Sequence, residues 1–581
     1  MTEISSLIVK ENTPIIDILN LFESASRNGL PKGLAIVVDP SDKLIGTVTD
    51  GDIRRAIITN GDMHQPAGAI MQKEPIFFAE NLSIQEILEQ LPKELERRGR
   101  KSKQFLGKIV IVDKAQRPTK VVEYHQLWEQ RIATHRHLVA VGLGYVGLTL
   151  ALALADAGFK ITGVDIDEKK VNQLNNGESY IHEIGLPELL RENIGKNFFS
   201  STEIPEDGDV YIISVGTPII FMEDGQLPQP VMDYLESSLQ MIAKTLSSGN
   251  LVILRSTVPV ATCRDYVIPR LEELTGMRCG FDFHLAFAPE RTAEGKAIKE
   301  LRELPQIIGG YNSDSVEATA AIFRELTSTI IRVDSLEVAE MAKLINNSFR
   351  DYVFAYSNFV SQLASEFNLN IFDVIKAANE GYPRDRVPLP SPGVGGPCLT
   401  KDPYIFSSVA SKVNLKDVVF KDSRFINEGM HPYIVDRIAE RLSQLGKTMD
   451  QTKILVCGLA FKGYPETGDI RNSTSVEILK LLEARGAQMT GYDPVALQEE
   501  IDYFNIKSVN IPEGFEGIDA VLFLNNHRSF EKIDVFEMVR SMSDNPIVFD
   551  GWNTFHEEDI LNAKPAVYMG LSHVSSSILN D

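Results

Sequence analysis

Leu138-Val-Ala-Val-Gly-Leu-Gly-Tyr-Val-Gly147 decides the fold of this 581-residue chain, because a short apolar strand runs directly into a G-x-G-x-x-G pattern. An alanine-rich helix from Leu148 to Ala157 follows, and then a second strand from Lys160 to Asp165. A strand, a glycine turn, a helix and an acidic residue about 20 positions further on are the fingerprint of a dinucleotide-binding βαβ unit. The stretch predicts an α/β domain of the Rossmann type.

The fingerprint also predicts which cofactor binds. Gly142 permits the tight turn, Gly144 lets a pyrophosphate approach the helix N-terminus, and Gly147 lets the helix pack on the strand. Asp165 can accept hydrogen bonds from an adenosine ribose, and its charge repels a 2′-phosphate. We therefore expect NAD rather than NADP.

Two later strands end in threonines. Tyr211-Ile-Ile-Ser-Val-Gly-Thr-Pro218 and Leu251-Val-Ile-Leu-Arg-Ser-Thr-Val-Pro259 place Thr217 and Thr257 at carboxyl ends of strands. Ligands bind open parallel sheets at that edge, so both threonines are candidate site residues.

Composition limits the kinds of partner. The chain carries 58 Lys and Arg against 80 Asp and Glu, a formal charge of -22, and no basic tract long enough to neutralise a phosphate backbone, which argues against nucleic acid. It has neither a signal-peptide pattern nor an apolar run near the ~20 residues of a membrane span, so we expect a cytoplasmic protein. Its four cysteines show neither disulfide nor zinc spacing, and no metal is expected.

A second informative stretch is Gly393-Val-Gly-Gly-Pro-Cys-Leu-Thr-Lys-Asp402. A free thiol with a pKa near ~8.5 attacks only as thiolate, and Lys401 together with a following helix could favour that form. Glycines 393, 395 and 396 let the backbone approach a bulky anionic ligand. The alternative is a buried thiol beside an ordinary turn, but three glycines and two charges are poor surroundings for an apolar side chain. The stretch predicts Cys398 as a nucleophile.

Two pairs of residues lie between these stretches. Glu290 and Glu294 are four apart, so on a helical turn they would share a face and could perform acid/base work or position water; a solvated acidic turn is the alternative. Lys343 and Asn347 have the same spacing and would share one face of a long helix, although such a pair can simply be a surface pair.

The pattern Asp334-Ser-Leu-Glu337 predicts a capping box that opens that long helix. Its apolar stripe, kept at helical spacing, consists of Val338, Met341, Leu344, Ile345 and Phe349. The apolar continuation through Phe354, Tyr356 and Phe359 fits a helix buried in a dimer core, the place that the family resemblance given below implies for it.

The C-terminal part reads as another α/β unit. Lys453 to Cys457 and Gln488 to Tyr492 are expected strands, and the helix between them covers Val476 to Ala484 after a capping box, Thr474-Ser-Val-Glu477. Gly486 ends that helix.

The first 132 residues contain a weak internal repeat. Pro14-Ile-Ile-Asp-Ile-Leu19 recurs as Ser83-Ile-Gln-Glu-Ile-Leu88, and Ile36-Val-Val-Asp39 as Val110-Ile-Val-Asp113. Each half predicts a helix, a strand, a polar turn, a second strand and a helix.

The segment Leu44-Ile-Gly-Thr-Val-Thr-Asp-Gly-Asp-Ile-Arg-Arg55 resembles a cystathionine β-synthase (CBS) motif, and the two halves resemble a CBS pair. The resemblance implies that Thr49 and Asp52 hold the ribose of an adenosine nucleotide, with Arg54 or Arg55 near phosphate. The second half has Glu123-Tyr-His-Gln126 where a matching site would lie, so at most one site is expected. A purely structural pair that binds nothing is the alternative.

From about residue 137 to the C-terminus the chain is similar to the UDP-glucose/GDP-mannose dehydrogenase family. In the family's order, the motifs are the glycine fingerprint, Ser256-Thr-Val-Pro259, Pro289-Glu-Arg-Thr-Ala-Glu-Gly295, Lys343 with Asn347, the cysteine loop and Gly458-Leu-Ala-Phe-Lys462. There are two departures: the spacing from Lys462 to Asp469 is two residues longer than in the UDP-glucose branch, and Trp552 stands where many members have arginine.

The resemblance implies a site and a reaction. The implied catalytic residues are Cys398, Lys343, Asn347, Asp402, Glu290, Glu294 and Thr257. The implied cofactor-binding residues are Gly142, Gly144, Tyr145, Val146, Gly147, Asp165, Thr217 and Lys401. The implied substrate-binding residues are Gly393, Gly395, Gly396, Phe461, Lys462 and Arg471. In the implied cycle NAD takes two hydrides from a sugar alcohol, Cys398 carries the thiohemiacetal and thioester, and Asp402 with Lys343 is the first candidate for proton transfer.

The cysteine loop has features of two substrate branches. Lys401-Asp402 resembles the UDP-glucose enzymes, whereas Pro392 to Gly396 and Asp402-Pro-Tyr404 resemble those acting on UDP-N-acetylhexosamines, which we favour. UDP-glucose oxidation, a single-step dehydrogenase and an adenosine-nucleotide sensor with an inactive dehydrogenase half are the alternatives.

The expected fold class is α/β, with two Rossmann-like domains joined by a helical dimerisation region and preceded by an α+β CBS pair. The expected boundaries are 1–132 for the CBS pair, 137–332 for the NAD domain, 333–445 for the helical region and 446–581 for the UDP-sugar domain. We expect a homodimer or a higher homo-oligomer.

Overall fold

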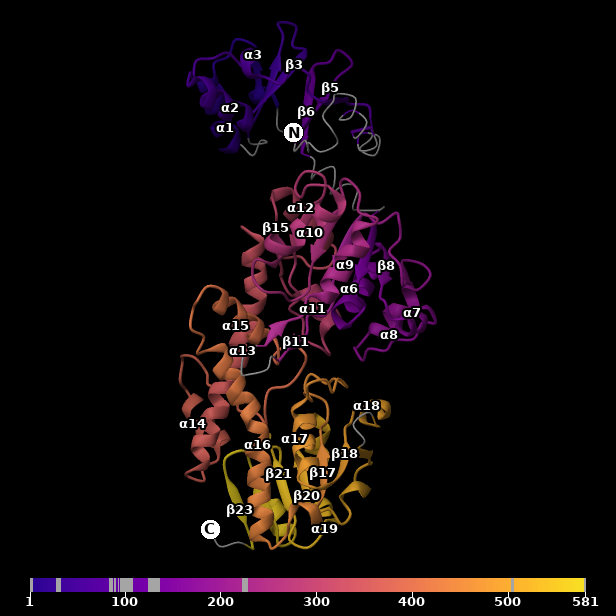
Figure 1. Ribbon diagram of the computed structural model, residues 1–581, viewed down its shortest axis with the longest axis vertical. Coiled ribbons are helices and arrows are strands. Elements are labelled where there is room, and N and C mark those ends of the chain that lie inside the picture. Colours follow the sequence, from indigo (N-terminus) through magenta and orange to yellow (C-terminus); the bar gives the residue numbers. More distant parts are fainter. Residues whose placement is uncertain are drawn as a thin grey trace.

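A computed structural model describes residues 4–27, 33–82, 108–123, 136–221, 228–502 and 506–578, together with positions 87, 90, 91 and 94. The N-terminal module, a first α/β domain, a helical connection and a second α/β domain follow one another along the longest axis (Figure 1). None of the helices in these ranges combines the length and apolar character needed to cross a membrane.

The first α/β domain is built on an eight-stranded sheet in the order β16-β15-β14-β13-β10-β7-β8-β9. Its strands are β7 (His137–Val141), β8 (Lys160–Val164), β9 (Phe198–Ser201), β10 (Val210–Ile213), β13 (Leu251–Leu254), β14 (His284–Phe287), β15 (Gln306–Gly310) and β16 (Ile330–Val333). All neighbours are parallel except β14 and β15. Buried apolar clusters cover both faces, which explains the uninterrupted apolar runs of the central strands.

Helices cover this sheet on both sides. They are α6 (Tyr145–Asp156), α7 (Glu168–Asn175), α8 (Leu186–Asn193), α9 (Asp233–Ala243), α10 (Ile268–Thr275), α11 (Ala297–Glu303) and α12 (Ser313–Phe323). The predicted βαβ unit is confirmed, but α6 begins three residues earlier than predicted, because Gly144 is its N-cap. Strands β10 and β13 end early, which leaves Thr217 and Thr257 in the loops that follow them.

The connection consists of α13 (Leu336–Ser365), α14 (Ile371–Asn379), α15 (Asp402–Lys412) and α16 (Phe420–Gln444). Ser335, not Asp334, caps α13, because its hydroxyl accepts from the Val338 N–H. Within one copy of the chain, much of the apolar stripe of α13 is exposed, so its expected burial in a dimer core stays a prediction. Leu344 is buried, but Phe349 is 65% exposed and Phe359 56% exposed.

The second α/β domain has a seven-stranded sheet in the order β19-β18-β17-β20-β21-β22-β23. Its strands are β17 (Lys453–Cys457), β18 (Gln488–Tyr492), β19 (Lys507–Ser508), β20 (Ala520–Phe523), β21 (Ile547–Asp550), β22 (Val567–Met569) and β23 (Val574–Ser576). Its helices are α17 (Thr474–Ala484), α18 (Gln498–Asp502), α19 (Val535–Ser541) and α20 (Glu557–Ala563). The predicted capping box at Thr474 is wrong: Ser473 is the N-cap and Thr474 is already helical.

The N-terminal module contains two small sheets of identical topology. The first half comprises β1 (Ile8–Lys10), α1 (Ile15–Arg27), β2 (Leu34–Val38), β3 (Leu44–Thr49), α2 (Asp50–Asn60) and α3 (Ala67–Ile70). The second comprises β4 (Phe77–Ala79), β5 (Lys108–Val112) and β6 (Pro118–Glu123). In each, a parallel pair is followed by an antiparallel pair with one register shift at the end of the central strand, in agreement with the predicted repeat.

The sequence pattern missed the first strand of each half, β1 and β4. The predicted repeat segment 83–88 lies outside the described residues except for Ile87, as do residues 124–126 and most of the segment 131–136 that joins the module to the first domain.

Candidate active site

The cysteine loop lies between α14 and α15 and packs against the second α/β domain. The Gly396 N–H donates to the Asn472 carbonyl at 3.0 Å, and the Asp402 N–H donates to the Cys398 carbonyl at 2.9 Å. A Cβ at Gly395 would lie 2.6 Å from the Asn472 oxygen, and one at Gly396 2.8 Å from the Phe461 ring. Close packing therefore requires glycine at both positions, and Cys398 remains exposed at the end of the loop.

Five charged or polar side chains gather here: Lys401 and Asp402 stand at the end of the loop, and Glu290, Lys343 and Asn347 come from other segments. From α13, Asn347 Nδ2 donates to Asp402 Oδ2 at 2.6 Å. Lys343 Nζ, on the same face, lies 3.4 Å from Glu290 Oε2, and Lys401 Nζ lies 2.7 Å from Asp402 Oδ1. Lys343 and Asn347 thus point away from the exposed apolar stripe, as the spacing predicted.

The protonation of the thiol differs from the prediction. Although part of Cys398 reaches solvent, loss of hydration among the surrounding protein atoms and the charge of Asp402 raise the pKa of its thiol to about 11, against the lowering effect of Lys343 and Lys401. Burial lowers the pKa of Lys343, but Glu290 and the other negative groups outweigh it and hold that pKa above its ordinary value. Lys343 therefore stays protonated at neutral pH, and Cys398 needs a neighbouring base.

The two glutamates do not share a helical face, because residues 290 to 293 have no regular structure and Glu294 lies in a turn. Glu290 is buried and accepts from the Thr292 N–H, and its pairing with Lys343 keeps its pKa low despite burial. Glu294 instead faces the second domain, where Thr467 Oγ1 donates to it at 3.5 Å. Burial and the charge of Asp469 raise the pKa of Glu294 to about 7. A carboxyl group with that pKa suits proton transfer at neutral pH.

The glycine turn after β7 fits a dinucleotide. Gly142 has φ +90°, and a Cβ there would meet Val215 and Ser214 atoms at 2.9–3.1 Å. A Cβ at Gly147 would lie 1.8 Å from the Gly142 carbonyl, whereas Gly144 faces open space that a side chain would fill. Asp165 Oδ2 accepts from the Leu143 N–H at 2.9 Å, which places this carboxylate beside the turn.

Thr217 and Lys401 connect the cofactor side to the cysteine loop. Thr217 Oγ1 donates to the Thr257 carbonyl at 2.5 Å and accepts from Lys401 Nζ at 3.5 Å. The two threonines after β10 and β13 therefore lie next to each other at the predicted sheet edge. Tyr145 and Val146 open α6, but Tyr145 turns its hydroxyl to Glu183.

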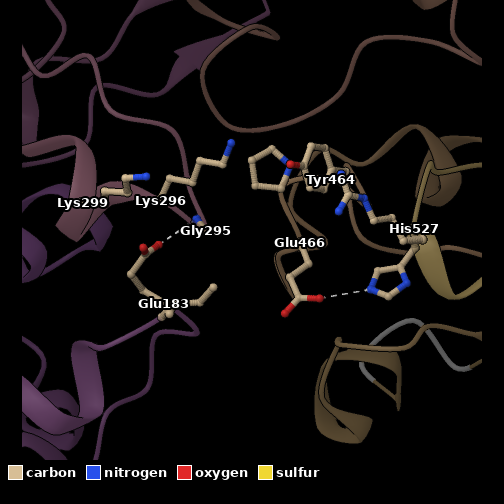
Figure 2. A pocket seen from close by; sticks show the side chains of 11 residues that line it. Glu183, Gly295, Lys296, Lys299, Tyr464, Glu466 and His527 are labelled. Carbon is tan, nitrogen blue, oxygen red and sulfur yellow. Dashed lines mark hydrogen bonds and ion pairs between the residues drawn. The ribbon is translucent and has the colours of Figure 1, made fainter. Parts of the chain in front are cut away.

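Two of the predicted substrate residues of the second domain lie beside the Glu294 turn or its neighbour Asp469. Lys462 Nζ donates to the Glu294 carbonyl at 2.8 Å, and Arg471 pairs with Asp469 at 2.5 Å. Trp552, one of the two departures, donates its indole N–H to the Leu524 carbonyl at 3.0 Å. The longer loop, the other departure, contributes Gly463 to Glu466 to a cavity of about 370 Å³ between the two α/β domains (Figure 2).

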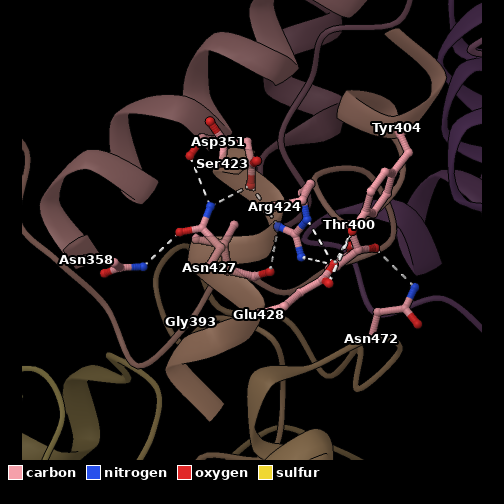
Figure 3. A network of polar contacts seen from close by, with 12 residues as sticks. Asp351, Asn358, Gly393, Thr400, Tyr404, Ser423, Arg424, Asn427, Glu428 and Asn472 are labelled. Carbon is pink, nitrogen blue, oxygen red and sulfur yellow. Dashed lines mark hydrogen bonds and ion pairs between the residues drawn. The ribbon is translucent and has the colours of Figure 1, made fainter. Parts of the chain in front are cut away.

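A buried polar network lies behind the cysteine loop (Figure 3). Arg424 Nη1 of α16 lies 2.7 Å from Asp351 Oδ1 of α13 and donates to the Val394 carbonyl at 3.3 Å. Asn358 Oδ1 accepts from the Ser391 N–H at 2.8 Å, and Asn358 donates to Asn427 at 2.9 Å. Two helices thus hold the segment that precedes Cys398.

In the N-terminal module, Thr49 and Asp52 bond to each other. Thr49 is the N-cap of α2, and its hydroxyl donates to Asp52 Oδ2 at 2.6 Å. Asp52 Oδ1 also accepts from Arg55 and from Gln72 Nε2, and Asp52 is 5% exposed. A ribose would have to replace part of this capping box.

Sequence reasoning missed three groups of site residues: Glu183, the Thr467–Asp469 segment beside Glu294, and the Asp351–Arg424 pair. Their partners are distant in sequence, and no local pattern marks them. Among these residues, only Asp469 features in the sequence analysis, as the end of the lengthened spacing from Lys462.

Comparison with known proteins agrees with this geometry. Models of the UDP-glucose/GDP-mannose dehydrogenase family match in three parts: the NAD binding domain at residues 136–327, the central domain at 337–429 and the UDP binding domain at 455–557. A CBS domain model matches residues 1–59.

Similar proteins carry related names. A UDP-N-acetyl-D-mannosamine dehydrogenase of Methanococcus maripaludis is 33% identical over 421 residues, which is 72% of this chain and 93% of that protein. An NDP-N-acetyl-D-galactosaminuronic acid dehydrogenase of Ralstonia nicotianae is 30% identical over 69% of this chain and 92% of that protein.

Among solved structures, a UDP-D-ManNAc dehydrogenase of Pyrococcus horikoshii matches with a TM-score of 0.67 and 30% identity, covering 75% of this chain and 99% of that one. The predicted fold, the predicted cofactor and the family resemblance are confirmed. The chain belongs to the UDP-glucose/GDP-mannose dehydrogenase family, as an NAD-dependent dehydrogenase that also carries an N-terminal CBS domain.

Proposed function

We propose that the protein oxidises the primary alcohol of a UDP-N-acetylhexosamine to the uronic acid in two hydride transfers. The observation that carries this proposal is the meeting of Cys398, the protonated Lys343 and Asp402 beside a dinucleotide cradle. A single-step dehydrogenase needs no thiol at this place. The names of the similar proteins support an N-acetylhexosamine as the sugar.

In the first oxidation, a carboxylate takes the proton of the sugar's C6 hydroxyl. Glu294, with a pKa of about 7, and Asp402 are the groups placed for it. NAD, when bound, accepts one hydride from C6 in each of the two oxidations. The product of the first is an aldehyde.

Cys398 then attacks the aldehyde carbon, and its thiol proton passes to Asp402, the carboxylate whose charge acts most strongly on this thiol. The oxyanion of the resulting thiohemiacetal is stabilised by the Lys343 ammonium and the Asn347 amide. The second oxidation gives a thioester. Water adds to the thioester carbon and gives one proton to Glu294, the C–S bond breaks, the Cys398 thiolate takes back the proton held by Asp402, and the acid leaves. Glu290 and Thr257 are further candidates for positioning this water.

In this proposal the domains keep the roles predicted from the sequence. Residues 1–132 are regulatory, 137–332 bind NAD, 333–445 serve assembly and carry the cysteine loop, and 446–581 bind the UDP-sugar. Phe461, Lys462 and Arg471, with glycines 393, 395 and 396, hold the nucleotide-sugar. Lys401 and Thr217 contact the cofactor.

The test is NADH formation across UDP-N-acetylglucosamine, UDP-N-acetylgalactosamine, UDP-N-acetylmannosamine, UDP-glucose and GDP-mannose. We expect one of the N-acetylated sugars to give the highest kcat/KM, with two NADH per acid formed. A higher kcat/KM for UDP-glucose would mean that UDP-glucose, not an N-acetylated sugar, is the substrate. One NADH per product would exclude the thioester route.

We also propose that α13 pairs with the same helix of a second copy. Its exposed apolar residues recur every three or four positions, as a buried helix–helix seam requires: Val338, Met341, Ile345, Phe349, Tyr352, Tyr356, Phe359 and Leu363. Such a stripe is costly to leave in water.

A double variant, Phe349→Asp with Phe359→Asp, is therefore expected to run as a monomer in size-exclusion chromatography with light scattering, where the parent runs as a dimer or larger. Ile58→Asp, which changes an even more exposed apolar residue of the N-terminal module, is the control and should leave the mass unchanged. An unchanged mass for the double variant would exclude α13 as the interface.

The N-terminal module is proposed to bind an adenosine nucleotide through Thr49 and Asp52. ATP, ADP or AMP is expected to change the apparent affinity for NAD⁺ or sugar nucleotide severalfold, since coupling between sites is typically about 1–3 kcal/mol. Asp52→Ala should remove the effect, while Asp50→Ala, the neighbouring exposed carboxylate, should retain it. Nucleotide binding is measured by calorimetry on the full chain. If no adenosine nucleotide binds at millimolar concentration, the module is a structural element only.

A further inference from the structure

Glu183 is a buried carboxylate that the proposed mechanism does not use. It lies in the loop between α7 and α8 and is 3% exposed. Its Oε1 accepts from the Ala297 N–H at 2.8 Å, and its Oε2 accepts from the Gly295 N–H at 2.7 Å and from the Tyr145 hydroxyl. Within the described part of the chain, no lysine or arginine nitrogen forms an ion pair with it. Among the described residues, the hydrogen bonds to its carboxylate all come from neutral donors, and Lys462 acts on it only through its charge.

These donors belong to two segments that the proposed reaction needs. Tyr145 directly follows Gly144 of the cofactor cradle and opens α6. Gly295 directly follows Glu294, and its N–H also lies 3.1 Å from the Tyr145 hydroxyl oxygen. Tyr145 and Gly295 are 150 residues apart in sequence, yet both donate hydrogen bonds to the Glu183 carboxylate.

The Glu294 turn is also held from its other side. Gly295 has φ +83°, and a Cβ there would lie 2.5 Å from the Glu466 carbonyl of the longer loop. Figure 2 shows Glu183 bonded to Gly295 on one side of the cavity and Glu466 on the other. The turn is thus fixed between the first domain's carboxylate and the second domain's loop.

Burying a carboxylate without a cation is expensive, because it loses hydration that only good hydrogen bonds replace. Ala297 is the first residue of α11, whose N-cap Lys296 makes no side-chain cap bond, so Glu183 supplies that acceptor. An apolar residue at position 183, with a different N-cap for α11, would stabilise the fold equally well, so stability alone does not explain this carboxylate. We propose that Glu183 is a positioning residue, which fixes the Glu294 turn against the cofactor cradle.

The charges around the two carboxylates make this testable. Glu294 is faced by Asp469, which raises its pKa, by Lys462 and Arg471, which lower it, and by Glu183, which raises it. Around Glu183 lie Tyr145, whose pKa is raised by burial and by this bond, and the cavity-lining Lys296 and Lys299; the charge of Lys462 acts on both carboxylates. Loss of the Glu183 charge should therefore move the pKa of Glu294 down.

The experiment compares three variants by calorimetric Kd for NAD⁺ and by the pH dependence of kcat/KM. Glu183→Gln is expected to raise the Kd severalfold and to move the acidic limb to lower pH by about half a unit or more. Tyr145→Phe keeps the charge but removes one donor, so only the Kd should rise. Glu188→Gln is the matched control, because it removes an exposed charge five residues away, and it should change neither.

Two results would overturn the positioning role of Glu183. An unmoved acidic limb together with a parent-like Kd in Glu183→Gln would reduce Glu183 to a structural residue. If that variant does not fold, a parent-like Kd in Tyr145→Phe overturns the proposal. The pH arm rests on the proposed function and on Glu294 acting there as the base; the calorimetric arm does not, so a chain inactive on every nucleotide-sugar still reports on Glu183.

Discussion

Cys398→Ala is expected to lose at least about a thousandfold in uronic acid formation, because no other side chain at the site can form the thioester. Cys263, Cys279 and Cys457 are buried elsewhere and cannot replace it. Product is measured as acid by mass spectrometry rather than as NADH alone, since the first oxidation does not need the thiol. The variant is expected to release aldehyde with a single NADH.

Cys398→Ser separates the steps further. Its hydroxyl can add to the aldehyde, but an ester hydrolyses more slowly than a thioester, so a covalent adduct should accumulate on the protein. Cys457→Ala is the control, because that thiol is buried in the second domain. Acid formation at the parent rate by the alanine variant would remove the covalent mechanism.

The second large effect is on stability. Arg424→Met should lower the free energy of unfolding by about 3–5 kcal/mol, because it leaves Asp351 buried without its cation. Both side chains are at most 1% exposed and their nitrogen and oxygen lie 2.7 Å apart. The measurement is urea denaturation followed by circular dichroism, with the transition of the helical region resolved by fluorescence where the domains unfold separately.

Two comparisons make that result specific. Lys421→Met changes an exposed cation one turn earlier on the same helix and should cost less than about 1 kcal/mol. Adding Asp351→Leu to Arg424→Met removes the stranded charge and should restore part of the loss. A single variant as stable as the parent would mean that the pair contributes nothing to the fold.

Much of this molecule was readable from local sequence. The strand, glycine turn and helix at 138–157 carry their own periodicity, and the cysteine loop carries its glycines together with its thiol. The α13 spacing correctly placed Lys343 and Asn347 on one face, because that depends only on helical geometry.

What could not be read depends on distant partners. Glu183 meets Gly295 across 112 residues and Arg424 meets Asp351 across 73, and no local pattern singled out Glu183, Arg424 or Asp351. The prediction that Lys401 favours the Cys398 thiolate failed for a related reason. Lys401 is near Cys398 in sequence, but its ammonium pairs with Asp402. The Glu290–Glu294 spacing suggested a helix, whereas the chain there is irregular and sends the two carboxylates to different neighbours.

Helix α13 carries the exposed apolar stripe on one side and Lys343 and Asn347 on the other. A straight helix of 30 residues spans about 45 Å, and both faces move as one body. Specific activity should therefore depend on enzyme concentration: serial dilution below the dissociation constant of the pair would loosen the lysine and amide opposite Cys398, and activity per milligram would fall.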